Sequence, residues 1–189
     1  MLTLRNILDV DFATQMLVRD WRNSENIRKY MTSERIISEE THKKWIKSLE
    51  NNNKTMFFIV FYEEKPIGIV TIYNIDYDNL KCEWGFYIFD TSLRGLGIGK
   101  RLEVSTLNFI FNEIGIKKLS CSVLETNPSV ISMHKKMGFE QEGLFKEEVQ
   151  RDDKRVDVIH LGMTSKTWEK IKNDRMQDID LANIITKEN

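Results

Sequence analysis

The sequence predicts an α+β (mixed α/β) fold, with one central, mixed but mostly antiparallel sheet of about six to seven strands and about four flanking helices. Two observations support this prediction. Apolar, β-branched segments of strand length alternate along the chain with segments of helical period. The chain has 189 residues, two prolines and no low-complexity run, so nothing marks a linker inside one domain with a sizeable core.

The first half of the chain contains four predicted strands or strand-like segments and two predicted helices. Residues 2–7 alternate like a strand, and residues 9–23 are predicted to form a helix with Asp11 as its expected cap. A second helix begins after Ser38 and carries four residues on one face, namely His42, Trp45, Ile46 and Leu49. Residues 55–64 and 66–76 form a hairpin around a Glu-Lys-Pro turn, and residues 81–89 form the next strand.

The second half continues the alternation. A long helix spans residues 100–115 with Gly115 as its stop signal, followed by a strand at 117–127 and a short helix at 128–138. Residues 139–164 form a closing hairpin. We expect one domain over residues 1–167 and a charged tail over 168–189, which adds a helix, packs on a partner or frays.

Composition excludes several classes of function. Lysine and arginine total 28 against 29 acidic residues, which disfavours a binder of nucleic acid or of anionic membranes. The apolar run at 57–62 is too short to cross a bilayer, and the first residues lack the features of a signal peptide, so we expect a cytoplasmic location. Cys82 and Cys121 are expected as buried reduced thiols, and the three scattered histidines suggest no metal site.

Three of the nine glycines fall within the segment SLRGLGIGKRL, residues 92–102, between a predicted strand and a predicted helix. The first N–H groups of a helix lack intrahelical partners, and glycine removes the Cβ that keeps an anion away from them. This pattern favours an anion-binding loop, although a tight turn that merely uses glycine remains an alternative. The spacing matches neither the dinucleotide-binding fingerprint nor a Walker P-loop.

Arg94, Gly97 and Gly99 resemble the Arg/Gln-x-x-Gly-x-Gly/Ala signature of the GCN5-related N-acetyltransferases (GNAT). A second block, from Asn127 to Gly138-Phe139, is similar to that family's second motif, and the element order from residue 2 to about 163 also fits. The resemblance implies the GNAT fold, acetyl-CoA as cofactor and two splayed strands around it. It implies a cofactor site whose members are Phe86, Tyr87, Ile88, Arg94, Gly95, Leu96, Gly97, Ile98, Gly99, Lys100, Asn127 and His134.

Within that site, the resemblance implies that backbone amides around residues 94–100 hold the pyrophosphate and that the strand at 85–88 pairs with the pantetheine arm. His134 stands where the family usually has the tyrosine that protonates the departing thiolate. An imidazolium can serve as that acid, but a histidine that only bonds cofactor or backbone is the alternative. Glu83 and Glu125 are the candidate bases, with solvated strand residues as the alternative. Both are expected near the carboxyl-side half of their strands, and Glu125 lies two residues before Asn127, hence on the same face.

The acceptor residues come from the N-terminal third, which resembles the nucleotide-sugar N-acetyltransferases of pseudaminic acid biosynthesis. This implies as acceptor the 4-amino group of a UDP-linked 4-amino-4,6-dideoxy sugar. The candidate contacts are Trp21, Arg22, Asn23, Met31, His42 and Trp45. For His42 and Trp45 a place in the core is the alternative. A protein N-terminus, a polyamine or another small amine is the rival acceptor, and a non-catalytic acyl-CoA-binding module is the rival class; a homodimer is compatible with either.

Overall fold

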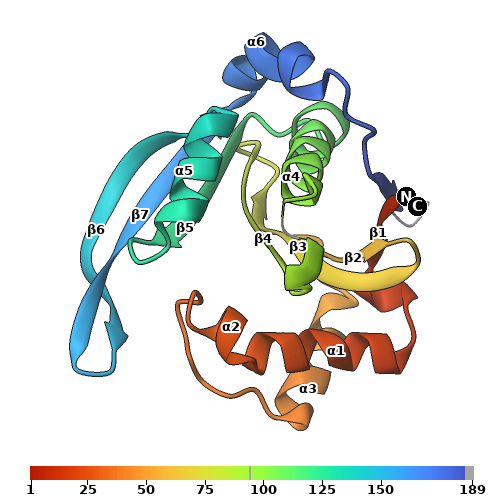
Figure 1. The fold of residues 1–189 in the computed structure, drawn as a ribbon, viewed down its shortest axis with the longest axis vertical. Helices are drawn as coiled ribbons and strands as arrows, with labels where there is room; N and C mark the ends of the chain where they lie inside the picture. Colours follow the sequence, from red (N-terminus) through yellow and green to blue (C-terminus); the bar gives the residue numbers. More distant parts are fainter. Residues whose placement is uncertain (94, 186–189) are drawn as a thin grey trace.

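The computed structural model describes residues 1–93 and 95–185, whose elements follow the predicted order (Figure 1). The strands are β1 (Leu2–Asn6), β2 (Met56–Tyr62), β3 (Lys65–Asp76), β4 (Lys81–Ile88), β5 (Lys118–Leu124), β6 (Glu140–Arg151), β7 (Lys154–Thr164) and β8 (Asn183–Ile185). The helices are α1 (Phe12–Asn23), α2 (Glu25–Arg28), α3 (Glu39–Leu49), α4 (Ile98–Asn108), α5 (Pro128–Met137) and α6 (Ser165–Met176). Short 3-10 turns at Ile7–Asp9 and Thr91–Leu93 complete the set, together with a π-helical segment at Phe109–Glu113.

Within the described ranges the strands form one sheet in the order β6-β7-β5-β4-β3-β2-β1-β8. Neighbouring strands are antiparallel except for β4 with β5 and β1 with β8. The predicted mixed, mostly antiparallel sheet is therefore confirmed. It has eight strands rather than six or seven because β8 comes from the C-terminal tail, and residues 1–93 and 95–185 contain six α-helices rather than about four.

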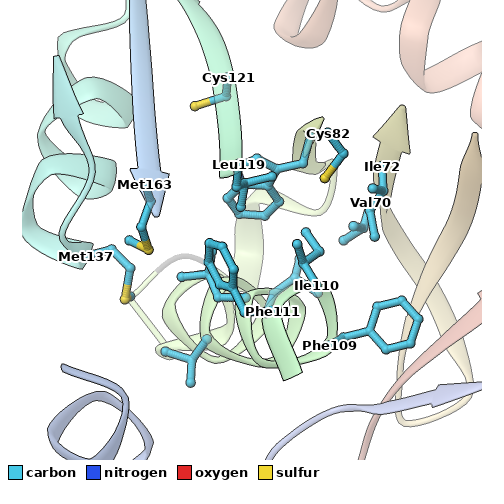
Figure 2. Packing of buried hydrophobic residues seen from close by; sticks show 14 of the residues in the cluster. Val70, Ile72, Cys82, Phe109, Ile110, Phe111, Leu119, Cys121, Met137 and Met163 are labelled. Carbon is cyan, nitrogen blue, oxygen red and sulfur yellow. The ribbon is translucent and has the colours of Figure 1, made fainter. Parts of the chain in front are cut away.

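Helices cover both faces of the sheet, and the two largest apolar clusters, which we call the larger and the smaller core, lie on opposite faces. α1 and α3 lie over one face, where Trp21, Ile46 and Ile69 belong to the smaller core. α4 lies over the other face and carries the larger core, in which the segment from Phe109 to Phe111 packs toward the strands (Figure 2). Cys82 and Cys121 are free thiols in this core, as expected. Because successive residues of a strand point to opposite faces, each strand contributes every second residue to one core and the residues between them to the other face.

Capping confirms both N-terminal helices. The Asp11 carboxylate accepts the Thr14 N–H at 2.9 Å, and the Ser38 hydroxyl accepts the Thr41 N–H at 3.1 Å. Each bond satisfies a backbone donor that has no partner within the helix.

The β2–β3 turn differs from the predicted Glu-Lys-Pro turn. Glu63 and Glu64 form it, with φ of 49° and 62°, and Lys65 already belongs to β3. Two successive positive φ values match the right-handed twist of a two-residue hairpin. Pro66 lies within β3 opposite Phe61, next to a register shift, which is where a strand tolerates a residue without an N–H.

The C-terminal tail packs against the rest of the chain. Trp168 is fully buried, and its ring lies 6.3 Å from that of Phe111. Further along, the Ala182 N–H donates to the Ser105 hydroxyl at 2.8 Å, and β8 extends the sheet beside β1. The boundary expected between residues 167 and 168 falls within α6. No helix in the described ranges is long and apolar enough to cross a membrane.

Candidate active site

β4 and β5 separate soon after they begin. They pair in parallel only over Lys81–Glu83 and Lys118–Ser120. Beyond this point β4 stays bonded to β3 as far as Ile88, and β5 stays bonded to β7 as far as Leu124. Among the described residues, the edge of 84–88 that faces β5 therefore has no strand partner. Such an edge presents backbone N–H and C=O groups to a ligand that can pair with them.

The glycine loop leads from this edge into α4. Gly97 is the N-cap residue with φ of 73°, and Gly95 has φ of 84°. Positive φ at both positions explains why the turn uses glycine. A Cβ built at Gly95, Gly97 or Gly99 meets no atom within 4 Å, so each glycine borders open space.

These features fit a pyrophosphate group. Gly97 provides no side-chain cap, so the first N–H groups of α4 remain available to an anion at the positive end of the helix. Leu96 is exposed in the loop, Lys100 lies exposed in the first turn of α4, and Arg94 lies outside the described residues. The Asp90 carboxylate braces the loop start by accepting bonds from Ser92 and Lys65, which lowers its pKa to about 2. The predicted loop thus has the geometry of an anion site.

Asn127 begins α5 on the far side of the separation between β4 and β5. It occupies the N-cap position before Pro128, but its side chain makes no capping bond. Its Oδ1 instead accepts the Ser129 hydroxyl at 3.1 Å. This side chain does not cap α5, because φ of −115° and ψ of 61° set the residue outside the usual capping geometry.

His134 lies inside the larger core. It is 5% exposed, and its Nδ1 lies 2.6 Å from the Oε1 of Glu103, a residue of α4 that is fully buried. Trp84 and Phe86 of β4 surround the ring, with centroids at 5.5 and 6.2 Å, and Phe139 lies at 5.1 Å. Sequence reasoning missed Glu103. The available signal was its position seven residues before Ile110, on the apolar face of the predicted helix.

Glu83 lies on the opposite face of β4 from Trp84, and hence on the opposite side of the sheet from His134. Its Oε1 accepts the Asn74 amide at 2.8 Å. We expected Glu83 in the carboxyl-side half of its strand. It is instead the third of eight residues, because β4 begins at Lys81 and pairs with β5 at once.

Glu125 was expected on a strand, on the same face as Asn127. It lies one residue beyond the end of β5, in a turn, so the alternation of a strand does not apply. Its backbone N–H donates to the Asp157 carbonyl at 3.0 Å, and its Oε1 accepts the Asp157 N–H at 3.2 Å. The turn therefore ties this carboxylate to β7.

Two of the six predicted acceptor residues, Trp21 and Trp45, belong to the smaller core. Trp21 is buried and stacks on Phe89 at 5.5 Å, and Trp45 packs edge-on against Phe57 at 4.9 Å. His42 is buried with Nε2 at 2.9 Å from the Gln15 carbonyl, and burial lowers its pKa. The Asn23 amide exchanges two bonds with the Ile37 backbone, at 2.8 and 2.9 Å, and Met31 is half-buried after α2.

Arg22 is the predicted acceptor residue that adjoins other cationic groups. Its Nη2 donates to the Ser33 carbonyl, while Arg151, at the end of β6, donates from Nη1 to the Thr32 carbonyl at 3.5 Å. Burial lowers the pKa of Arg22, and the charges of Arg151 and Arg28 act in the same direction. The strand residue Tyr87 also interacts with Arg22, and burial raises the pKa of its hydroxyl.

Both guanidinium groups keep an unused donor. Arg22 Nη1 and Arg151 Nη2 are buried and have no hydrogen-bond partner among the described residues. The Glu34 carboxylate lies 3.8 Å from Arg151 Nη1 and only partly balances the charge. We call Arg22, Arg28 and Arg151 the arginine cluster. Sequence reasoning named Arg22 but missed Arg151, because the two residues meet only when the β6–β7 hairpin folds toward the segment between α2 and α3.

Comparison with known proteins places these features in a family. A family model described as an acetyltransferase (GNAT) domain matches residues 10–159. The acetyltransferase PseH of Campylobacter jejuni is 26% identical over 139 residues, which cover 74% of this chain and 85% of PseH. The spermidine N(1)-acetyltransferase of Vibrio cholerae is 25% identical over 148 residues, 78% of this chain and 83% of that protein.

The fold is also similar to that of a solved structure. The crystal structure of spermidine N-acetyltransferase from Vibrio cholerae, in complex with CoA and spermine, superposes with a TM-score of 0.81 at 22% identity. The match covers 89% of this chain and 98% of that one.

Proposed function

The chain belongs to the GNAT acetyltransferase family, and on this premise we propose that it acetylates the 4-amino group of a nucleotide-linked amino-deoxy sugar of the pseudaminic acid type. The donor is acetyl-CoA and the reaction is N-acetyl transfer to a small-molecule amine. The resemblance to PseH is compatible with a sugar amine, while the resemblance to spermidine N(1)-acetyltransferase is compatible with a polyamine. We choose between the sugar amine and the polyamine by the charge of the residues at the proposed acceptor site.

The arginine cluster is the observation that carries the proposal. Two buried guanidinium N–H groups without a partner are costly, since a buried unsatisfied donor costs about 1–3 kcal/mol and a charged one more. Both nitrogens are covered in this structure, and phosphate oxygens would satisfy both donors through charge-assisted bonds once the groups that cover them move aside. A nucleotide-linked sugar carries a diphosphate that supplies these oxygens, whereas an amine without a phosphate group does not.

The same cluster disfavours a polyamine. Spermidine carries several positive charges at neutral pH, and like charges close together repel one another, most strongly where water is partly excluded. The cluster contains three arginines, and Glu34 is the carboxylate within 4.0 Å of Arg151. A polyamine site requires an excess of carboxylates at this position, which the cluster does not offer.

The position of the cluster suits an acceptor that approaches β4 from the α1–α3 side. Arg22 interacts with Tyr87, which lies within the stretch of β4 that has separated from β5 and packs toward the smaller core. Glu83 is on this same face of β4. We therefore assign the acceptor to this face, with Glu83 or Glu125 receiving the amine proton through water.

Two parts of the structure fit acetyl-CoA, namely the glycine loop and the free edge of β4. The N–H groups of Gly95 to Lys100 would hold the pyrophosphate, and the free edge of 84–88, with Asn127 opposite, would hold the pantetheine arm. Bound acetyl-CoA supplies an acetyl group activated as a thioester. Residues of β4 alternate between its two edges, and the Phe89 N–H donates to the Ile67 carbonyl of β3. The backbone N–H groups of Phe86 and Ile88 therefore point to the free edge. His134 is the assigned proton donor.

The test is an acceptor panel containing UDP- and dTDP-linked 4-amino sugars, spermidine and a peptide with a free N-terminus, with acetyl-CoA-dependent thiol release as the readout. We expect turnover with a nucleotide-linked amino sugar. Turnover of spermidine or the peptide, with none of any nucleotide sugar, would sink the proposal.

Charge variants sharpen the test. Arg151→Met should raise KM for the nucleotide sugar by about tenfold or more, the equivalent of one charge-assisted bond, and leave KM for acetyl-CoA unchanged. Arg19→Met is the matched control, because Arg19 lies on α1 and pairs with its neighbour Asp20. Equal effects of the two variants would contradict a phosphate contact at Arg151.

A further inference from the structure

Glu103 and His134 form a buried polar pair between α4 and α5. The Oε1 to Nδ1 distance is 2.6 Å, and the side chains are 0% and 6% exposed respectively. Glutamate is almost never fully buried unless it is paired, because removing a carboxylate from water is expensive. The pair therefore occupies its position at a thermodynamic cost that apolar residues of the same size would avoid.

The pair is not fully satisfied. Glu103 Oε2 and the Trp84 indole N–H are both buried and have no hydrogen-bond partner among the described residues. Trp84 is also one of the rings that surround His134. Native interiors leave few such atoms, and a polar link that served only to join two helices would be expected to use both carboxylate oxygens. The carboxylate of Glu103 therefore uses one oxygen for His134, and among the described residues its second oxygen and the Trp84 N–H remain without a partner.

The orientation of the imidazole follows from this contact. Nδ1 faces Glu103 on α4, so Nε2, on the other side of the ring, points away from α4. The ring meets β4 at Trp84 and Phe86, past the point where β4 and β5 separate. The nitrogen that can exchange a proton therefore belongs to the part of the ring farthest from Glu103.

We infer that Glu103 is a positioning residue for His134: it accepts the Nδ1–H, fixes that tautomer, and leaves Nε2 as the nitrogen that releases and regains a proton. The inference rests on the proposed role of His134 as proton donor. When Nε2–H of the imidazolium gives up its proton, the ring becomes a neutral imidazole with Nδ1–H still bonded to the carboxylate, and the proton is regained from solvent. Burial raises the pKa of the neighbouring Cys121 thiol to about 12, so this group stays protonated beside the pair.

The tautomer can be read without any substrate. The chain has three histidines, so ¹⁵N signals of His134 can be assigned by comparing labelled wild type with His134→Gln. We expect a protonated Nδ1 in wild type. A wild-type His134 that is protonated at Nε2 with a bare Nδ1 would place the shared proton on Glu103 and overturn the inference.

The kinetic test uses Glu103→Gln, which keeps the shape of the side chain and removes its charge, with Glu103→Asp as the variant that keeps the charge. We expect Glu103→Gln to lower kcat about tenfold or more with KM for acetyl-CoA unchanged, and Glu103→Asp to recover part of the loss. Glu113→Gln, an exposed change further along the same helical stretch, is the matched control.

A double-mutant cycle shows whether Glu103 acts through His134. The double variant Glu103→Gln/His134→Gln should be no slower than His134→Gln alone. Additive losses, or a Glu103→Gln enzyme with wild-type kcat and only lower stability, would overturn the inference and leave a structural pair. If wild-type protein turns over no amine, the proposed function fails, and the ¹⁵N measurement alone decides the state of the pair.

Discussion

Substitution of the loop glycines tests the cofactor site most directly, because the structure separates two effects of an added Cβ. Gly97 has φ of 73°, so alanine there is strained by about 1–2 kcal/mol. Gly99 lies in the first turn of α4 without positive φ, where alanine is about 0.5–1 kcal/mol better than glycine. Gly115 has φ of 82° and open space around it, but lies at the other end of the helical stretch.

The three variants therefore have distinct expected results. Without ligand, Gly97→Ala and Gly115→Ala should each lower Tm by about 2–8 °C, and Gly99→Ala should leave it unchanged or slightly higher. A Cβ at Gly97 or Gly99 also occupies the open space beside the α4 N–H groups. If it disrupts one bond to a phosphate, worth about 1.5–3 kcal/mol, the Kd for CoA should rise roughly 10- to 100-fold.

The assay is isothermal titration of CoA into wild type and each variant, beside calorimetric unfolding of the unliganded proteins. Weaker CoA binding in Gly97→Ala and Gly99→Ala, with wild-type binding in Gly115→Ala, is the expected pattern. Wild-type affinity in both loop variants would refute the pyrophosphate site. An equal loss in Gly115→Ala would show that backbone strain, not the added Cβ, weakens binding.

Three predictions concern stability. Gly68→Ala should lower the free energy of unfolding in urea by about 1–3 kcal/mol, since its Cβ would lie 2.2 Å from the Tyr87 carbonyl oxygen, whereas Gly85→Ala, with open space, should be nearly neutral. Trp168→Ala should cost about 3–5 kcal/mol, and a loss below about 1 kcal/mol would mean that the tail is separable. The lowered pKa of His42 means that the unfolded state binds more protons between that pKa and 6.5, so stability should fall as pH drops below 6.5. His42→Asn should flatten that dependence, and an unchanged slope would contradict it.

The features that the sequence predicted correctly depend on neighbours in the chain. The Asp11 and Ser38 caps join residues three positions apart, and the glycine loop between β4 and α4 is one continuous segment. Local hydrogen bonding and backbone preference determine such features before the chain is compact. For the same reason the order of strands and helices could be predicted from periodicity alone.

The features that only the tertiary structure decided join residues distant in the chain. Glu103 meets His134 across two helices, Arg22 meets Arg151 through a folded hairpin, and β8 reaches β1 at the far edge of the sheet. Glu125 shows how a prediction from strand alternation fails. The strand was expected to continue through Glu125, but β5 ends at Leu124, so Glu125 has no strand face. The sequence by itself was enough to predict the proposed donor site, because one loop contains N–H groups that could hold a pyrophosphate. The charge that we propose selects the acceptor depends on which distant side chains packing brings together, and no local pattern specifies that.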